Sequence, residues 1–270
     1  MSDTPSSTRN SRCALKGAFI TFEGIDGCGK TTQARLLADK LKAHDFSVVE
    51  TREPGGTQIG REIRDIVLAT RNTFISRSLS SDRLNIRAIQ PTSQLLLFLA
   101  DRIQHINEII RPAIESGKVV ICDRYHDATI AYQKYGGELN LDILEPLITE
   151  EITPTKPDLT FWLDIDEGKA RERTHIGDSP AIQLSFLLEL GANFDLENDI
   201  AIDKLSAKLI NSTKSRPQQI QLRYLRRIRK GYAALHKADK NRIEKIDGSK
   251  TIEEVQSIIW ENLTRRFHVL

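Results

Sequence analysis

Residues 24–31 read Gly-Ile-Asp-Gly-Cys-Gly-Lys-Thr, the complete pattern of a phosphate-binding loop. The glycines of this stretch allow successive backbone N–H groups to turn toward one anion. We predict that Lys30 contacts the β- and γ-phosphates of a nucleotide and that the Thr31 hydroxyl binds Mg²⁺. The alternative is an incidental glycine-rich turn. The predicted phosphate-binding residues are Gly24, Ile25, Asp26, Gly27, Cys28, Gly29, Lys30, Thr31 and Thr32.

Two acidic residues are candidates for the same site. Asp26 lies inside the loop, where its charge would repel phosphate oxygens unless it faced Mg²⁺ or a second substrate. We therefore expect an acceptor side next to the loop. Asp123 ends an apolar run at residues 119–123 and is predicted to orient Mg²⁺ or its water. The alternative for Asp123 is a cap on the segment that follows the strand.

Arg52, Arg102 and Arg124 stand near the predicted ends of three elements. The guanidinium group makes paired hydrogen bonds to phosphate, so arginines that face one cleft favour an acceptor that carries a phosphate. Any one of them alone is more often a solvated surface charge. Phe98 lies one helical turn before Arg102, and an aromatic ring beside a guanidinium could bind a base. A place for Phe98 in the core is the alternative.

Alternating strands and helices must position these residues. The strands are predicted at residues 18–22, 47–51, 119–122, 159–163 and 242–246, and the helices at 32–43, 58–68, 93–115, 141–148, 167–174 and 220–238. This alternation is typical of an α/β fold, in which a parallel sheet is covered on both faces. Ligands of such sheets bind at the carboxyl ends of the strands, where the loop, Arg52 and Asp123 all fall.

Three segments stand apart from this pattern. Residues 1–16 are rich in Ser, Thr and Arg, and we interpret them as a disordered tail rather than a targeting peptide. Residues 70–91 are predicted to form an extended loop. Residues 175–215 are predicted to be an insertion with its own small hydrophobic contact. We expect the remaining chain, residues 17–270, to form one domain.

Composition excludes several classes of protein. The 270 residues are 39% hydrophobic and 28% charged, as in soluble globular proteins. A net charge of +2 gives no bulk basicity for nucleic acid, and we interpret the arginine-rich helix at 220–238 as a solvated helix. No apolar run is long enough to predict a membrane span. The cysteines, Cys13, Cys28 and Cys122, lack metal spacing and indicate reduced thiols in a cytoplasmic protein.

Taken in order, several segments resemble those of the thymidylate kinase family, bacterial type. The resemblance covers residues 17–174 and 216–265, and the ordered set is far more specific than any later motif alone. The segments are FEGIDGCGKTTQ (22–33), TREPGGT (51–57), IRDIVL (63–68), LLLFLADRIQH (95–105), GKVVICDRY (117–125), AYQ (131–133), PDLTFWLDI (157–165) and RIRKGY (227–232).

The resemblance implies a three-layer P-loop kinase fold with a five-stranded parallel sheet, and a homodimer. It implies that residues 24–32 bind ATP and that Mg²⁺-dependent transfer converts dTMP to dTDP, for dTTP synthesis. Thymine would lie against Phe98, with Arg102 at the base edge and Thr129 and Gln133 completing base recognition. Ala128 stands where relatives often have serine, which leaves Thr129 to supply the hydroxyl.

The resemblance also assigns the phosphate and sugar contacts. Arg52 and Arg124 would hold the dTMP phosphate, and Tyr132 would screen the 2′ position of the sugar. Glu53, Arg64 and Asp26 would line the sugar and phosphate region, and the implied catalytic residues are Lys30, Asp26, Arg124 and Arg216.

The lid of the family departs most from this chain. Its place reads Lys-Ser-Arg-Pro-Gln at 214–218, after the insertion, so Arg216 is the candidate for the lid cation. Arg171 and Arg173 stand behind it as further candidates. Two other functions remain open from the sequence: a kinase for another nucleoside monophosphate or a nucleoside, and a catalytically weak nucleotide-binding regulatory homologue.

Overall fold

The computed structural model describes residues 15–67, 89–137, 148, 155–174 and 216–268. Within these residues the chain forms one five-stranded sheet in which every pairing is parallel, with the order β2-β3-β1-β4-β5. Every strand bound lies within one residue of its prediction, which confirms the α/β fold class. The strands are β1 (Phe19–Glu23), β2 (Val48–Arg52), β3 (Val119–Asp123), β4 (Leu159–Asp164) and β5 (Ile243–Asp247).

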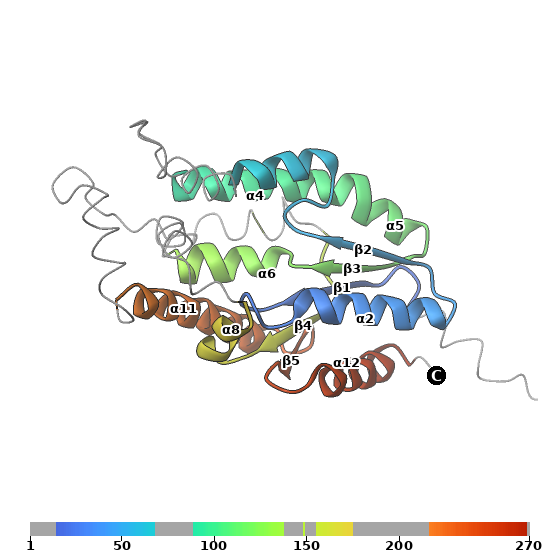
Figure 1. The fold of residues 1–270 in the computed structure, drawn as a ribbon. Coiled ribbons are helices and arrows are strands. Elements are labelled where there is room, and N and C mark those ends of the chain that lie inside the picture. The colour runs from blue at the N-terminus through green and yellow to red at the C-terminus, as the bar shows by residue number, and fades with distance from the viewer. Residues whose placement is uncertain (1–14, 68–88, 138–147, 149–154, 175–215, 269–270) are drawn as a thin grey trace, which may run out of the picture.

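Helices cover both faces of this sheet. α2 (Lys30–Ala43) and α12 (Ile252–Phe267) pack against each other, and Figure 1 shows them side by side in blue and red. Val120 clusters with Ile110 whereas its neighbour Ile121 belongs to the core that includes α2. Successive strand residues point to opposite faces, so three layers result. The other helices are residues 58–67, α4 (Pro91–His105), η1 (Ile106–Ile110), α5 (Arg111–Glu115), α6 (His126–Thr129), η2 (Ile130–Gly136), α8 (Glu167–Thr174) and α11 (Arg216–Ala238).

The helix predicted at 93–115 is not a single α-helix. It runs from Pro91 as α4, widens to π-helical geometry in η1, and returns to α-helix in α5. Pro112 has no N–H and its ring would meet the carbonyl of Glu108 in a regular α-helix. The wider turn before Pro112 relieves that clash.

The last helix on the lid side begins earlier than predicted. α11 starts at Arg216 rather than at residue 220, so residues 216–218 are helical and do not belong to a lid loop. Pro217 is compatible with this start, because the first N–H groups of a helix have no intrahelical acceptor to lose.

Several predicted segments fall outside the described residues: most of the tail, residues 70–88 of the loop, nearly all of the helix at 141–148, and the insertion at 175–215. The end of the predicted tail is described, however, and Leu15 is fully buried in the main hydrophobic core. No helix in the described ranges is both long and apolar enough to cross a membrane.

We predict that Leu15→Ala lowers the free energy of unfolding by about 2–5 kcal/mol, because it empties a filled core site. Urea denaturation measures this change. Lys16→Ala, an exposed neighbour, is the matched control and should shift the value by less than about 0.5 kcal/mol. Equal unfolding midpoints for the two variants would contradict a core position for Leu15.

Candidate active site

The glycine-rich loop between β1 and α2 has the backbone that its sequence predicts. Gly24, Gly27 and Gly29 have φ angles of 139°, 83° and 99°, a region that side chains disfavour. A Cβ on Gly24 would lie 2.7 Å from the Leu163 carbonyl oxygen and 2.8 Å from Cys28 Sγ. Gly29 caps the N-terminus of α2 in the left-handed conformation. The loop therefore aims the positive end of α2 at its own concave side.

Lys30 lies across this loop. Its side chain is buried, and Nζ donates to the Ile25 carbonyl oxygen at 3.0 Å and toward Cys28 Sγ at 3.7 Å. Burial raises the pKa of the Cys28 thiol, so Cys28 is a neutral packing residue of the core. The ammonium group is thus held over the loop, within reach of any phosphate that the loop binds.

Thr31 and Asp123 provide oxygen atoms that fit Mg²⁺. Thr31 Oγ1 donates to Asp123 Oδ2, while Asp123 Oδ1 is buried and has no hydrogen-bond partner among the described residues. Hydroxyl and carboxylate oxygens are ligands that Mg²⁺ prefers. The described part of the chain holds no cluster of three or more His, Cys, Asp or Glu placed for a metal ion. Bound Mg²⁺ would therefore take its other ligands from phosphates and water.

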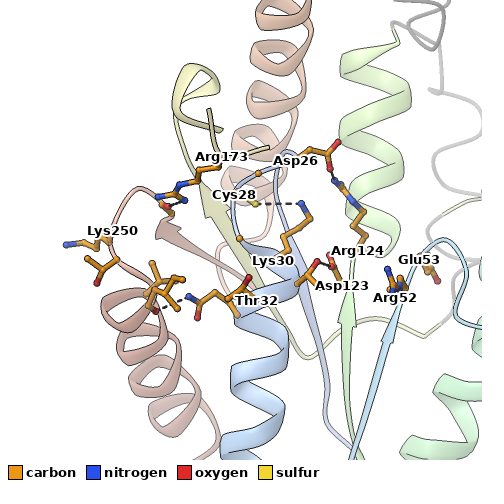
Figure 2. Close-up of a pocket in the computed structure, with 18 of the residues that line it drawn as sticks. Asp26, Cys28, Lys30, Thr32, Arg52, Glu53, Asp123, Arg124, Arg173 and Lys250 are labelled. Carbon is orange, nitrogen blue, oxygen red and sulfur yellow. Dashed lines mark hydrogen bonds and ion pairs between the residues drawn. The ribbon is translucent and has the colours of Figure 1, made fainter. Parts of the chain in front are cut away.

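A pocket of about 730 Å³ opens over the loop. Figure 2 shows its labelled residues: Lys30 and Thr32 belong to the loop and α2, Asp123 and Arg124 to the end of β3, and Arg52 and Glu53 to the end of β2. Its lining residues are Asp26, Gly27, Cys28, Gly29, Lys30, Thr31, Thr32, Gln33, Arg52, Glu53, Arg64, Asp123, Arg124, Arg173, Gly248, Lys250, Thr251, Ile252 and Val255.

The wall opposite the loop is strongly cationic. Burial, and next the positive charges of Arg52 and Arg124, lower the pKa of Arg64. Such mutual repulsion makes a bound anion favourable at this wall. Arg64 is held by a hydrogen bond of 3.0 Å from Nη1 to the Pro54 carbonyl oxygen. The pocket thus has one phosphate-binding wall built from backbone and a second built from arginines.

Arg124 joins the two walls. Its guanidinium donates to the Gly24 carbonyl oxygen at 3.3 Å, to Asp26 Oδ1, and to the Tyr132 hydroxyl at 2.9 Å. Burial opposes this charge, but Tyr132 and Asp26 together raise the pKa of Arg124 well above its usual value. The charge of Asp26 inside the loop is therefore neutralised by Arg124 of the opposite wall.

A buried polar cluster supports the loop after β2. Arg102 Nη2 and Nε lie 2.7 Å and 2.8 Å from Glu53 Oε2, and His105 Nδ1 lies 2.9 Å from Glu53 Oε1. Burial would raise the pKa of Glu53, but Arg102 and His105 more than offset this, and the pKa is lowered. Arg102 Nη1 is buried without a partner in the described ranges, and Arg102 does not line the pocket.

Comparison with known proteins gives the family. The model of the family described as thymidylate kinase matches residues 22–190. The chain belongs to the thymidylate kinase family. It is 34% identical to the thymidylate kinase of Nostoc punctiforme, covering 92% of this chain and 96% of that protein. The Halothermothrix orenii thymidylate kinase is 36% identical, with 92% and 97% covered.

A solved structure is similar over nearly the whole chain. The crystal structure of thymidylate kinase from Ehrlichia chaffeensis aligns with a TM-score of 0.59 at 26% identity, covering 91% of this chain and 98% of that one. Sequence and structure thus agree on a P-loop kinase fold for this thymidylate kinase family member.

None of the residues predicted to bind the base lines the pocket described above. Phe98 is partly exposed and lies outside the described hydrophobic clusters, while Leu95 and Leu99 form the buried side of α4. Partial exposure counts against a place for Phe98 in the core, but Phe98 does not line the pocket described above, so its contact with a base stays a prediction. Thr129 is buried and Gln133 is partly exposed, and neither lines the pocket described above. Their contacts with a base stay predictions.

Arg173 and residues 248–255, which follow β5, form a third wall of the pocket that the sequence did not predict. Arg216 is the first residue of α11, but its side chain lies outside the described residues. Of the two further candidates for the lid cation, Arg171 and Arg173, the structure brings Arg173 to the pocket. Its Nη1 donates to the Gly248 carbonyl oxygen at 2.7 Å. Gln33 Nε2 on α2 donates to the Ile252 carbonyl oxygen at 3.0 Å. The end of β5 could have revealed this wall, because it meets the loop at the same sheet edge.

We predict a pH dependence of stability from Asp101, whose Oδ1 accepts the Gly55 N–H at 3.1 Å. Burial, and next the charge of Glu53, raise the pKa of Asp101 to about 6, from 3.8. The folded state holds the proton of Asp101 more tightly than the unfolded state does. Protonated Asp101 therefore contributes fully to the free energy of unfolding below pH 4, and about 2–3 kcal/mol of this contribution is lost as pH rises toward 6.

Asp101→Asn keeps the acceptor for Gly55 and removes the titration. The difference in free energy of unfolding between variant and unsubstituted protein should therefore grow between pH 4 and pH 6 and then level off. Urea denaturation across that range measures it, with the exposed Asp65→Asn as control. A difference that is flat with pH would contradict the raised pKa.

Proposed function

We propose that this thymidylate kinase family member transfers the γ-phosphoryl group of ATP to dTMP, giving ADP and dTDP. The observation that carries the proposal is the pairing of walls in one pocket. A phosphate-binding loop with Lys30 faces a second wall with Arg52, Arg64 and Arg124. Two phosphate-bearing ligands can therefore meet between them, as phosphoryl transfer requires.

ATP is proposed to bind along the phosphate loop and against the third wall of the pocket, at Arg173 and residues 248–255. Residues 24–32 would bind its phosphates, and the nucleoside half would lie toward residues 248–255 and Arg173, because the pocket continues there. Thr31 and Asp123 would hold Mg²⁺, which neutralises charge on the phosphates when bound. Lys30 supplies a further positive charge at the transferring group.

The acceptor is proposed to bind with its phosphate on the arginine wall. Arg52 and Arg124, with Arg64, would hold that phosphate in line with the γ-phosphate of ATP. A phosphate oxygen is already ionised near neutral pH, so no dedicated base is needed. Tyr132, whose hydroxyl accepts a hydrogen bond from Arg124, would screen the 2′ position of the sugar. Phe98, Arg102, Thr129 and Gln133 would recognise thymine.

Two parts of the proposal concern the lid and the location of the protein. Arg216, or Arg173 from α8, would bring a cation to the transferring group, and Asp26 would set the position of Arg124. We also propose a cytoplasmic protein that supplies dTDP for dTTP synthesis. Kinases for other acceptors and a catalytically weak regulatory homologue are not favoured, because the sequence and structural relatives named above are thymidylate kinases.

An acceptor panel tests the function. With ATP and Mg²⁺, the protein should phosphorylate dTMP with a higher kcat/KM than dUMP, dCMP or dGMP. We predict that Lys30→Ala lowers kcat at least about a hundredfold without a change in Tm, because it removes charge from the transition state. Lys42→Ala, an exposed lysine on the same helix, is the matched control. Normal dTDP formation by Lys30→Ala would overturn the assignment.

We further propose that the protein is a homodimer formed through residues 58–67 and α4. Ile59 and Ile66, two helical turns apart, are 52% and 53% exposed, and on α4 Leu96 and Ile103 are 60% and 43% exposed. These helices meet where Gly60 faces Asp101. Exposed apolar side chains at that spacing on two adjoining helices favour an interface.

We predict that Ile66→Glu and Leu96→Glu each shift the protein from dimer to monomer, because a charge would be buried at the interface. Sedimentation equilibrium measures the mass. Ile252→Glu, at an isoleucine on α12 that is 51% exposed, should leave the mass unchanged. A monomeric unsubstituted protein at micromolar concentration would contradict the proposal.

A further inference from the structure

Glu23 is a buried carboxyl group directly before the phosphate loop. It is the last residue of β1 and is fully inaccessible to solvent. Its Oε1 accepts the Tyr125 N–H at 2.8 Å and the Ala128 N–H at 3.3 Å, and its Oε2 accepts the Tyr232 hydroxyl at 2.8 Å. The side chain therefore links β1 to the turn after β3 and to α11.

That turn contains Arg124 in an unfavourable backbone conformation. Arg124 has a φ angle of 72°, which costs a residue with a side chain about 1 kcal/mol or more. β1 holds the peptide groups on both sides of it: the Arg124 N–H donates to the Phe22 carbonyl oxygen at 3.0 Å, and the Tyr125 N–H donates to Glu23. Such a conformation persists only where surrounding contacts over-determine it.

The backbone conformation decides where the guanidinium of Arg124 points. From this turn the side chain reaches the Gly24 carbonyl oxygen and Asp26 at the phosphate loop. If the peptide between Arg124 and Tyr125 were released, the residue could relax toward negative φ, and the Cβ direction would change with it. Contacts of Arg124 with a ligand phosphate would then be lost although the arginine remained.

We propose that Glu23 is a positioning residue for phosphoryl transfer, which acts by holding Arg124 in its left-handed conformation. This inference rests on the proposed function of the pocket. The part that matters is an acceptor oxygen at Oε1, because that atom accepts the Tyr125 N–H in the turn and the Ala128 N–H in α6.

Charge on Glu23 is not required for this role. Burial, and next the neighbouring charge of Asp127, raise the pKa of Glu23 to about 8, which shifts the group toward its neutral acid. A glutamine at this position has the same reach and keeps one acceptor oxygen. An aspartate keeps the carboxyl group but is one methylene shorter, and it cannot span the same contacts without movement of the backbone.

The test compares Glu23→Asp with Glu23→Gln. Glu23→Asp should lower kcat/KM for dTMP about tenfold or more, since small misplacements of catalytic groups are costly, while KM for ATP stays within about threefold. Glu23→Gln should keep kcat/KM for dTMP within about threefold of the unsubstituted protein. If Glu23 had only a structural role, activity would follow stability. Two variants with equally lowered Tm would then lose kcat/KM equally, and glutamine would not restore it.

A double-mutant cycle with Arg124→Ala identifies the group that Glu23 serves. In the Arg124→Ala background, Glu23→Asp should have little further effect on kcat/KM for dTMP. Thr21→Val, a buried change on β1 that breaks the 2.7 Å hydrogen bond to Thr160, is the control, and its effect should be the same in both backgrounds. An equal loss from Glu23→Asp in both backgrounds, or no loss in either, would overturn the inference.

The outcome is separable from that of the proposed function. If the unsubstituted protein forms no dTDP, the proposed function fails. The same variants would then be compared by their calorimetric affinity for inorganic phosphate, and Glu23→Asp should still weaken it while Glu23→Gln should not. Equal phosphate affinities in all three proteins would count against positioning by Glu23.

Discussion

The ion pair between Arg124 and Asp26 is the contact on which the site depends. It crosses from the turn after β3 to the phosphate loop, and so joins the two walls of the pocket. Without Arg124, the carboxylate of Asp26 would repel the phosphates that the loop is built to bind. Without Asp26, the arginine wall would hold a set of like charges with less to offset them. Burial, and next the charges of Arg52 and Arg124, already lower the pKa of Arg64.

Beneath this contact, two buried carboxyl groups hold the loops that carry the arginines. Glu53 bonds Arg102 and His105 under the loop after β2, and Glu23 bonds the turn after β3. The buried ion pair of Glu53 with Arg102 adds little net stability, because desolvation offsets its attraction. The value of both carboxyl groups here is geometric: each one fixes loop backbone at the sheet edge where ligands bind.

Much of the fold followed from local pattern. The central strands β1, β3 and β4 are mostly apolar runs because a parallel sheet is buried on both faces, and a run of that kind can be recognised without knowledge of its neighbours. The phosphate loop could be predicted in the same way, since its glycines meet a local backbone requirement. The π-helical turn before Pro112 and the early start of α11 at Arg216 were missed, because both are settled by how a proline fits its helix rather than by hydrophobic period.

By itself, the sequence determined the strand–loop–helix unit, the positions of Lys30, Thr31 and Asp123, and the family. These depend on residues close together in the chain or on an ordered set of motifs. Only the tertiary structure decided which charges meet: that Arg124 neutralises Asp26, that Glu53 pairs with Arg102, and that residues 248–255 complete the pocket. Such contacts join segments far apart in the chain, and their pairing follows from the order and register of the strands, which no local pattern encodes.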